Sequence, residues 1–227
     1  MHLPCSLVIF RVDKLYKAYS DRPILSEVDF ELTTGEIMAV FGRNGSGKTT
    51  MFDCICGLKK ADIELYWNRE RIRPVDLFNQ KLLGYVPQNP FLPLHLRVRD
   101  LISLYLSDVK LQEDLYYDTV IAEINGRFLG QLSQGQRKYL ELCLVGHLQR
   151  PVLIMDEPFT MLEPKQIELA KLRIGSWSDG SAILISDHYY NHVWELSNRQ
   201  MVIDQGYGKS VDTLDDLRSL GYLPSKQ

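Results

Sequence analysis

Residues 42–50 combine three glycines with a lysine and two threonines, the residue types that bind a phosphate chain. In order they are Gly42, Arg43, Asn44, Gly45, Ser46, Gly47, Lys48, Thr49 and Thr50. The glycines let consecutive backbone N–H groups converge on phosphate oxygens, and Lys48 can reach the β- and γ-phosphates. The Thr49 hydroxyl is placed to coordinate Mg²⁺, and Thr50 adds a phosphate contact. This spacing predicts a nucleotide site; the alternative is an ordinary glycine-rich turn.

A second chemical pattern is the apolar run of residues 152–155, which ends in Asp156 and Glu157. A carboxylate such as Asp156 can hold Mg²⁺ through its water shell, and Glu157 can polarise a water molecule in line with the γ-phosphate. Taken alone, the pair could be two solvated carboxylates at a strand end. Together with a phosphate loop, the pair predicts hydrolysis of the bound nucleotide.

Both patterns require strands that end at the same edge of a sheet. The apolar residues 37–41 predict a strand before the phosphate loop, and residues 48–58 predict a helix after it. The positive end of that helix would then face the phosphates. Alternating residues before residue 36 and in residues 62–72 predict an antiparallel layer beside this core.

Residues 132–136 form the motif that separates one class of phosphate-loop ATPase from the others. They read Leu132, Ser133, Gln134, Gly135 and Gln136, directly before a predicted helix over residues 137–149. The motif is similar to the signature of ATP-binding cassette (ABC) ATPases, usually Leu-Ser-Gly-Gly-Gln, with Gln134 as the departure. The resemblance implies that Ser133, Gly135 and Gln136 of one subunit cover ATP bound to a second subunit. On its own, the motif reads as a polar turn in which Ser133 caps a helix.

The same resemblance assigns two residues that follow core strands. Gln88, after the run of residues 83–87, matches the glutamine that senses Mg²⁺ and the γ-phosphate in the family. His188, after residues 183–187, matches the histidine that orients the attacking water or Glu157. The register leaves Asp187 as an alternative to His188. In isolation, the segment of Gln88 would be interpreted as an ordinary turn and that of His188 as a solvated strand end.

An aromatic residue upstream of the phosphate loop is expected to stack on adenine. The family pattern favours Tyr19, and Tyr16 is the competing candidate, because alternation along a strand over residues 7–16 could carry either ring into the core. Residues 159–163 occupy the segment that the family uses to couple its two ATP sites. Glu163 replaces the usual aspartate there, and Phe159 and Met161 replace small polar residues.

Length and composition agree with one domain. The chain has 227 residues, 45% of them apolar, and a net charge of −3 with dispersed Lys and Arg, which gives no indication of a nucleic-acid face. We expect a single α/β phosphate-loop ATPase over residues 1–227, with a mostly parallel core sheet and an antiparallel layer. Residues 89–131 are expected to form a helical subdomain, and residues 206–227 a tail. The four scattered cysteines are interpreted as reduced packing residues.

No apolar run approaches the roughly 18 residues that a membrane-spanning helix needs, and the N-terminus lacks a leader pattern. The chain is therefore expected to be cytoplasmic. The resemblance implies a peripheral attachment to the membrane, through a groove that receives a membrane-spanning permease subunit. The groove would lie within residues 88–100, where the apolar residues are Phe91, Leu92, Leu94 and Leu96. These residues could instead pack the helical subdomain against the core.

The leading hypothesis is the ATP-hydrolysing subunit of a transporter that uses ATP and Mg²⁺ and closes as a homodimer or heterodimer. One alternative is a soluble cassette regulator or assembly factor; another is a nucleotide-binding scaffold with little turnover, against which the intact Glu157 argues. The cargo and its direction of transport stay open, because the resemblance places substrate contacts on the membrane partner.

Overall fold

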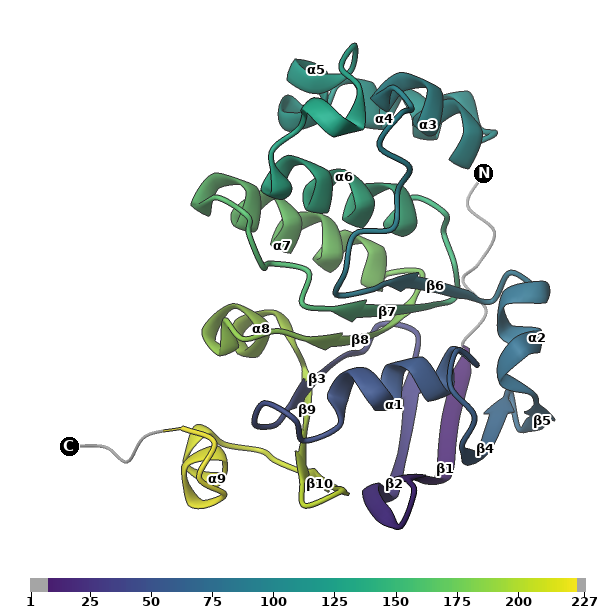
Figure 1. Ribbon diagram of the computed structural model, residues 1–227, viewed down its shortest axis with the longest axis vertical. Helices are drawn as coiled ribbons and strands as arrows, with labels where there is room; N and C mark the ends of the chain where they lie inside the picture. Colours follow the sequence, from purple (N-terminus) through teal and green to yellow (C-terminus); the bar gives the residue numbers. More distant parts are fainter. Residues whose placement is uncertain (1–7, 224–227) are drawn as a thin grey trace.

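A computed structural model describes residues 8–223 of the chain and shows one mixed sheet with helices packed on it (Figure 1). Within these residues the strand order is β5-β4-β1-β2-β10-β9-β3-β8-β7-β6. The predicted tail residues 224–227 and Cys5 lie outside the described part. Cys54, Cys56 and Cys143 are buried and free. Among residues 8–223, no helix combines the length and the apolar character that crossing a bilayer needs.

The parallel half of the sheet carries both chemical patterns. Its strands are β3 (Ile37–Phe41), β6 (Leu83–Val86), β7 (Val152–Asp156), β8 (Ala182–Ser186) and β9 (Arg199–Asp204). Every residue of β3, β7 and β8 is buried, as expected for parallel strands that are covered on both faces. Because these strands run parallel, the residues that follow β3, β6, β7 and β8 meet at one edge of the sheet.

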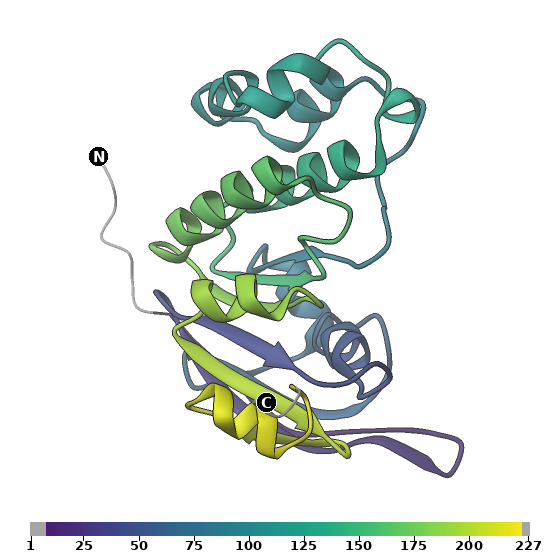
Figure 2. The same ribbon diagram turned by 90° about the vertical axis from the view of Figure 1, so that its left-hand side faces the viewer.

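The antiparallel half is formed by β1 (Ile9–Tyr19), β2 (Arg22–Thr33), β4 (Asp62–Trp67) and β5 (Glu70–Ile72). β10 (Tyr207–Ser210) joins the two halves, antiparallel to β9 and parallel to β2. Asn68 and Arg69 have φ of 49° and 72°, the left-handed pair that a two-residue hairpin turn requires. β1 continues beyond the predicted residue 16 and pairs with β2 up to the turn at residues 20–21. In Figure 2 this hairpin extends past the rest of the sheet.

Two apolar clusters separate the helices by the face they cover. Below the parallel strands, α1 (Lys48–Ile55) and α2 (Pro74–Asn79) pack in a cluster with β1, β2 and β4. Above them lie α6 (Gln134–Gly146), α7 (Pro164–Ser178) and α8 (Tyr190–Leu196), with α9 (Leu214–Ser219) in the same cluster (Figures 1 and 2). α1 ends earlier than the predicted residue 58, and Gly57, at φ 72°, follows as the usual left-handed terminator.

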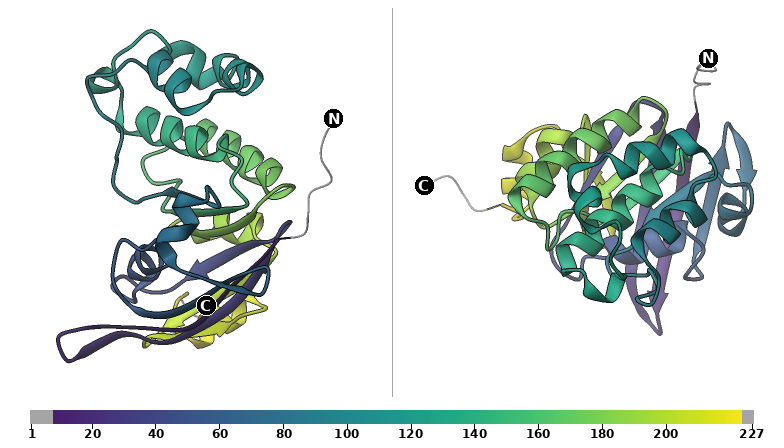
Figure 3. Two further views of the ribbon diagram at one scale, coloured as in Figure 1. Left: turned by 90° about the vertical axis from the view of Figure 1, so that its right-hand side faces the viewer. Right: turned by 90° about the horizontal axis from the view of Figure 1, so that it is seen from above.

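Three short helices lie beyond α6 and α7, away from the sheet (Figure 3). They are α3 (Val98–Tyr105), α4 (Val109–Tyr116) and α5 (Thr119–Ile124), followed by the short turn η1 (Leu129–Gln131). Asp108 and Asp118 accept hydrogen bonds from the first amides of α4 and α5, which explains why the predicted helical stretch is divided into separate helices. All of these elements lie within the predicted subdomain of residues 89–131.

Candidate ATP site

The phosphate loop has a backbone that only glycine accommodates at its key positions. Gly42, Gly45 and Gly47 have φ of 153°, 79° and 107°. A Cβ on Gly42 would stand 2.4 Å from Ser46 Oγ and 2.9 Å from the Ile203 carbonyl oxygen, so both space and φ exclude other residues. Gly47 precedes α1 without a side-chain cap, so the first N–H groups of that helix are directed towards the loop.

Lys48 is the first residue of α1, and its side chain points back over the loop. Its ammonium donates to the carbonyl oxygens of Gly42 at 2.6 Å and Arg43 at 3.3 Å. Burial lowers the pKa of Lys48, and the charges of Asp156 and Glu157 act in the opposite direction. An anion bound in the loop would add further compensation for this partly desolvated cation.

Asp156 ends β7 as a buried carboxylate with unused acceptors. The residue is 1% exposed, and neither carboxylate oxygen has a hydrogen-bond partner within the described chain. Burial raises the pKa of Asp156 to about 6; the nearby Thr49 hydroxyl opposes the rise, whereas the Glu157 charge adds to it. Two orphaned oxygens beside Thr49 fit a hard divalent cation such as Mg²⁺, which prefers carboxylate and hydroxyl oxygens.

Glu157 follows Asp156 in a conformation that is unusual for a residue with a side chain. Its φ is 53°, and its amide donates to the Ser186 carbonyl oxygen at 2.7 Å, across to the end of β8. One carboxylate oxygen lies 2.8 Å from His188 Nε2, and the other accepts from the Thr160 hydroxyl at 3.3 Å. Left-handed backbone at a non-glycine residue is costly and is concentrated at functional sites.

The side chains of His188 and Asp187 have different partners. His188 contacts Glu157, whereas Asp187 is buried and accepts from the amides of Phe159 at 2.8 Å and Tyr189 at 3.0 Å. Burial raises the pKa of Asp187. Asp187 therefore holds the segment after Glu157 in place. The sequence did not indicate this role, because the contact of Asp187 with Phe159 joins separate loops; it also did not indicate the contact of Thr160 with Glu157, three residues earlier.

Gln88 lies two residues beyond β6, exposed and at the same edge of the sheet. Val86 of β6 pairs with Met155 of β7. Gln88 and Glu157 each lie two residues beyond this pair, so they leave the sheet at the same level. The structure thus gathers the phosphate loop, Gln88, Asp156, Glu157 and His188 at one sheet edge.

The signature residues stand apart from this group within one chain. Ser133 caps α6: its hydroxyl accepts from the Gln136 amide at 3.1 Å, and the Gln136 side chain accepts from the Ser133 amide. The helix therefore begins at Gln134, ahead of the predicted residue 137. Gly135 is buried against residues 159–163, where an added Cβ would stand 2.4 Å from the Met161 carbonyl oxygen. Among the described residues, no hydrogen bond or ion pair joins residues 132–136 to the phosphate loop.

Tyr19 and Tyr16 are both partly exposed, so neither ring enters the core as alternation had allowed. Tyr19 ends β1 opposite Arg22, close in the hairpin to Ile24 and Leu25 of β2. A Cβ added to Gly47 of the phosphate loop would stand 2.9 Å from the Leu25 side chain and 3.1 Å from that of Ile24. Lys17 Nζ lies 4.9 Å from the centre of the Tyr19 ring. Base stacking by Tyr19 stays a prediction.

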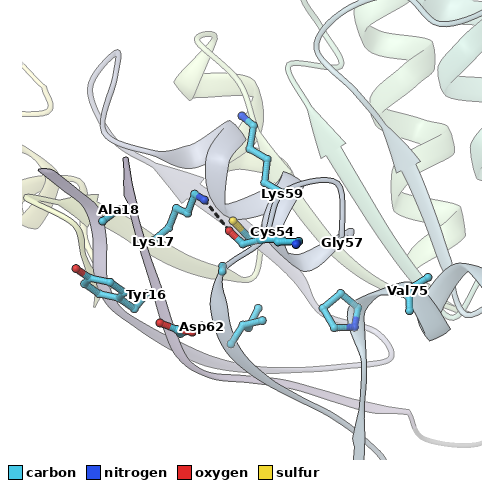
Figure 4. Close-up of a pocket in the computed structure, with 12 residues that line it drawn as sticks. Tyr16, Lys17, Ala18, Cys54, Gly57, Lys59, Asp62 and Val75 are labelled. Carbon is cyan, nitrogen blue, oxygen red and sulfur yellow. Dashed lines mark hydrogen bonds between the residues drawn. The ribbon is translucent and has the colours of Figure 1, made fainter. Parts of the chain in front are cut away.

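Tyr16 instead lines a cavity of about 790 Å³ between β1, the end of α1 and α2. Figure 4 shows Lys17 and Ala18 at one end and Val75 at the other. The Lys17 ammonium donates to the Lys60 carbonyl oxygen at 2.6 Å within it. None of the phosphate-loop or carboxylate residues lines this cavity, so its size does not mark the ATP site.

The predicted groove residues divide between exposure and packing. Phe91 and Leu94 are 39% and 51% exposed, whereas Leu92 is buried and Leu96 packs against the upper apolar cluster. Phe91 also lines a cavity of about 210 Å³ together with Phe78, Tyr85, Tyr105 and Val145. Leu92 and Leu96 thus pack as the alternative interpretation expected, and the groove for a membrane partner stays a prediction.

The fold and this edge of the sheet define a phosphate-loop nucleotide-binding protein. The model of the family described as "ABC transporter" matches residues 25–160, which is more than half of the chain and includes the phosphate loop, the signature and both carboxylates. The chain therefore belongs to the ABC transporter family and carries its ATP-binding domain.

Curated relatives agree with this assignment. The Fe(3+) ions import ATP-binding protein FbpC of Haemophilus influenzae is 30% identical over 220 residues, covering 90% of this chain and 62% of FbpC. The zinc import ATP-binding protein ZnuC of Acinetobacter baylyi is 30% identical, covering 88% and 74%. The lipopolysaccharide export system ATP-binding protein LptB of Acidithiobacillus ferridurans is 26% identical, covering 92% and 93%. The chain thus spans 62% of the length of the iron-import relative.

Solved structures confirm the fold. The structure of an ATP-binding subunit of an ABC transporter superposes with a TM-score of 0.82 at 24% identity and covers 96% of this chain and 95% of that one. A bacterial Atm1-family ABC exporter with ATP bound gives a TM-score of 0.82 at 19% identity, covering 97% of this chain and 41% of the exporter. At these identities the likeness concerns the fold alone.

Proposed function

We propose that this chain is the ATP-hydrolysing subunit of a transporter and drives a separate membrane-spanning partner by ATP-dependent dimer closure. The observation that carries the hydrolytic part of the proposal is the Glu157–His188 contact of 2.8 Å, held at the sheet edge that also presents Asp156 and the phosphate loop. A carboxylate oriented by a second polar group is the arrangement that general-base activation of water requires.

Each residue of the site has a role in this mechanism. Gly42, Gly45 and Gly47 present backbone N–H groups to the phosphates, and Lys48 reaches the β- and γ-phosphates. Glu157 orients the attacking water. His188 and Thr160 hold the two carboxylate oxygens of Glu157. Tyr19 would stack on the base, and Arg43, Asn44, Ser46 and Thr50 of the loop would contact the bound nucleotide.

A magnesium ion fits the residues around Asp156. Thr49, Gln88 and Asp156 supply the hydroxyl, amide and carboxylate oxygens that would hold it, and the two Asp156 oxygens have no hydrogen-bond partner in the described chain. The ion would neutralise charge that develops on the phosphates during hydrolysis. Asp156 would then be ionised at neutral pH, because a bound cation favours the charged carboxylate.

The separation of the signature from the phosphate loop supports a composite site between two chains. Ser133 is exposed at the N-terminus of α6, where its hydroxyl and the helix end can face an anion on a second subunit. Two subunits would then share two ATP molecules, each between the phosphate loop of one and Ser133, Gly135 and Gln136 of the other. ATP drives closure only through contacts that are better in the closed state, and this arrangement supplies them.

The membrane partner would insert an apolar segment beside Phe91, where the cavity between α2, β6, α3 and α6 opens. The chain would act at the cytoplasmic face of the membrane. The named relatives include importers and an exporter, so neither cargo nor direction follows from the likeness.

Replacing Glu157 with glutamine tests the proposal. The variant is expected to bind ATP with Mg²⁺ but lose about 10²-fold or more in kcat, and therefore to accumulate as an ATP-bound dimer in light scattering. Glu168→Gln, an exposed carboxylate on α7, is the matched control and should remain active. A Glu157→Gln variant that stays monomeric with ATP, or that retains full activity, contradicts the mechanism.

The partner is tested separately by purifying the tagged chain from detergent-solubilised native membranes. A polytopic membrane protein in stoichiometric amount supports the transporter assignment. Recovery only with ribosomal or other cytosolic proteins would favour a soluble cassette regulator and leave the ATPase chemistry unchanged.

A further inference from the structure

Two buried charged side chains on α6 have no role in the motifs described above. Lys138 and Glu141 are one helical turn apart and are 5% and 1% exposed. Charged residues are rarely this buried unless they are specifically paired, and replacing a buried charge by an apolar side chain is often neutral or stabilising. Their burial therefore calls for an explanation other than stability.

Lys138 binds the backbone of two separate strand ends. Its ammonium donates to the carbonyl oxygens of Pro87 at 2.7 Å, Gln88 at 3.3 Å and Asp156 at 3.4 Å. Three acceptors use all three N–H donors of a lysine. The side chain thus connects the signature helix to the segment that carries Gln88 and to the end of the strand that carries Asp156.

Glu141 binds the same segment from its other end. Its Oε1 accepts from the amides of Phe91 at 3.1 Å and Leu92 at 3.4 Å, and its Oε2 has no partner in the described chain. Burial raises the pKa of Glu141, and the two amides act against this rise. The positive side chain thus meets carbonyl groups and the negative one meets amides, so residues 87–92 are held at both ends by one helix.

We propose that Lys138 and Glu141 are positioning residues that fix residues 87–92 to the signature helix, so that Gln88 and the signature move as one unit. This inference rests on the proposed role of Gln88 at the γ-phosphate. It adds a direct physical link: ATP bound by Ser133 of one subunit pulls on α6, and α6 repositions Gln88 in that subunit's own site. Because Phe91 lies in the same held segment, the motion also reaches the apolar cavity beside it.

The kinetic test compares Lys138→Met, which removes all three donors, with Lys138→Gln, which keeps an N–H donor. Misplacing a catalytic group by about 1 Å costs about 10²-fold, so Lys138→Met is expected to lower kcat by roughly 10- to 10²-fold and to raise the Mg²⁺ requirement. ATP affinity should change little, because the phosphate loop is untouched. Lys138→Gln should recover part of kcat. Lys171→Met, a lysine paired with Glu195 on another helix, is the control and should keep wild-type kcat.

Hydrogen–deuterium exchange of the peptide that covers residues 87–92 gives a readout that does not depend on turnover. Glu141→Leu removes the acceptor for two amides, so exchange of this peptide should rise several-fold; Glu141→Gln retains an acceptor oxygen and should restore most of the protection. Wild-type protein should show ATP-dependent protection of this peptide, and both Lys138→Met and Glu141→Leu should lose it.

The outcomes separate this inference from the proposed function. The inference is overturned if Lys138→Met is only less stable to unfolding. Its kcat, Mg²⁺ dependence and hydrogen–deuterium exchange would then match the wild type, and Lys138 would be purely structural. Loss of the ATP-dependent protection of residues 87–92 in Lys138→Met and Glu141→Leu supports the inference. This support holds even if the Glu157→Gln experiment contradicts the proposed hydrolytic mechanism. Wild-type protection in Glu141→Leu would equally refute the link.

Discussion

Replacing Asp156 with asparagine is expected to stabilise the nucleotide-free protein at neutral pH and to abolish its stabilisation by ATP and Mg²⁺. Burial raises the pKa of Asp156 to about 6, against an ordinary value of 3.8. At about 1.36 kcal/mol per pKa unit, ionising this carboxylate in the folded protein costs about 3 kcal/mol more than in the unfolded chain. An unpaired asparagine amide keeps part of the desolvation cost, so the net gain should be about 1–3 kcal/mol.

The sign of the pH dependence follows from which state binds the proton more tightly. The folded protein does so, because its Asp156 pKa is raised. The contribution of this group to stability is therefore fully present below about pH 3.8 and is lost as the pH rises through about 6. The difference in unfolding free energy between variant and wild type should thus be small at pH 4 and should reach its full value at pH 7 to 8.

Urea unfolding at several pH values measures this difference, with and without ATP and Mg²⁺. Without nucleotide, Asp156→Asn should be the more stable protein at pH 8; with saturating ATP and Mg²⁺, the wild type should gain stability and the variant should not. Asp179→Asn, an exposed carboxylate at the end of α7, should show neither effect. A variant less stable than wild type at pH 8 without nucleotide would refute the argument from burial.

Three further outcomes are expected. Gly135→Ala should destabilise the protein by about 1–3 kcal/mol in urea unfolding, because the new Cβ meets the Met161 carbonyl oxygen at 2.4 Å. Gly175 is a helical glycine with open space around it, so Gly175→Ala should not destabilise the protein. Equal effects of the two substitutions would contradict this argument. His188→Ala should lower kcat by about 10²-fold with little change in the KM for ATP. His95 is exposed, and His95→Ala should leave kcat unchanged. An unchanged kcat in His188→Ala would remove His188 from the mechanism. Tyr19→Ala should weaken ATP binding by roughly 1–3 kcal/mol in calorimetry, with Tyr19→Phe near wild type; a larger effect of Tyr16→Ala would reverse the choice between the two rings.

The two strongest motifs could be recognised from the sequence because each is contiguous and its chemistry is local. In the phosphate loop, the spacing of Gly42, Gly45 and Gly47 dictates a backbone that presents N–H groups, whatever surrounds it. In residues 152–157, an uninterrupted apolar run can be covered on both faces only within a parallel sheet, which delivers its terminal carboxylates to the functional edge.

Boundaries and registers were less well determined. Whether His188 or Asp187 reaches Glu157 depends on a one-residue difference after β8, and the sheet pairing of Asp156 with Ser186 places the turn that decides it. The choice between Tyr19 and Tyr16 depends likewise on irregularities in the pairing of β1 with β2, which alternation alone does not predict.

By itself, the sequence determined the residue types that can bind phosphates, and with the family resemblance it determined the fold class. Only the tertiary structure decided which side chains work together. Lys138 and Glu141 read as ordinary polar positions of a helix, yet folding buries them against a segment about 50 residues earlier in the chain. Such contacts are set by how separate elements pack, and local spacing carries no information about a partner that is so distant along the chain.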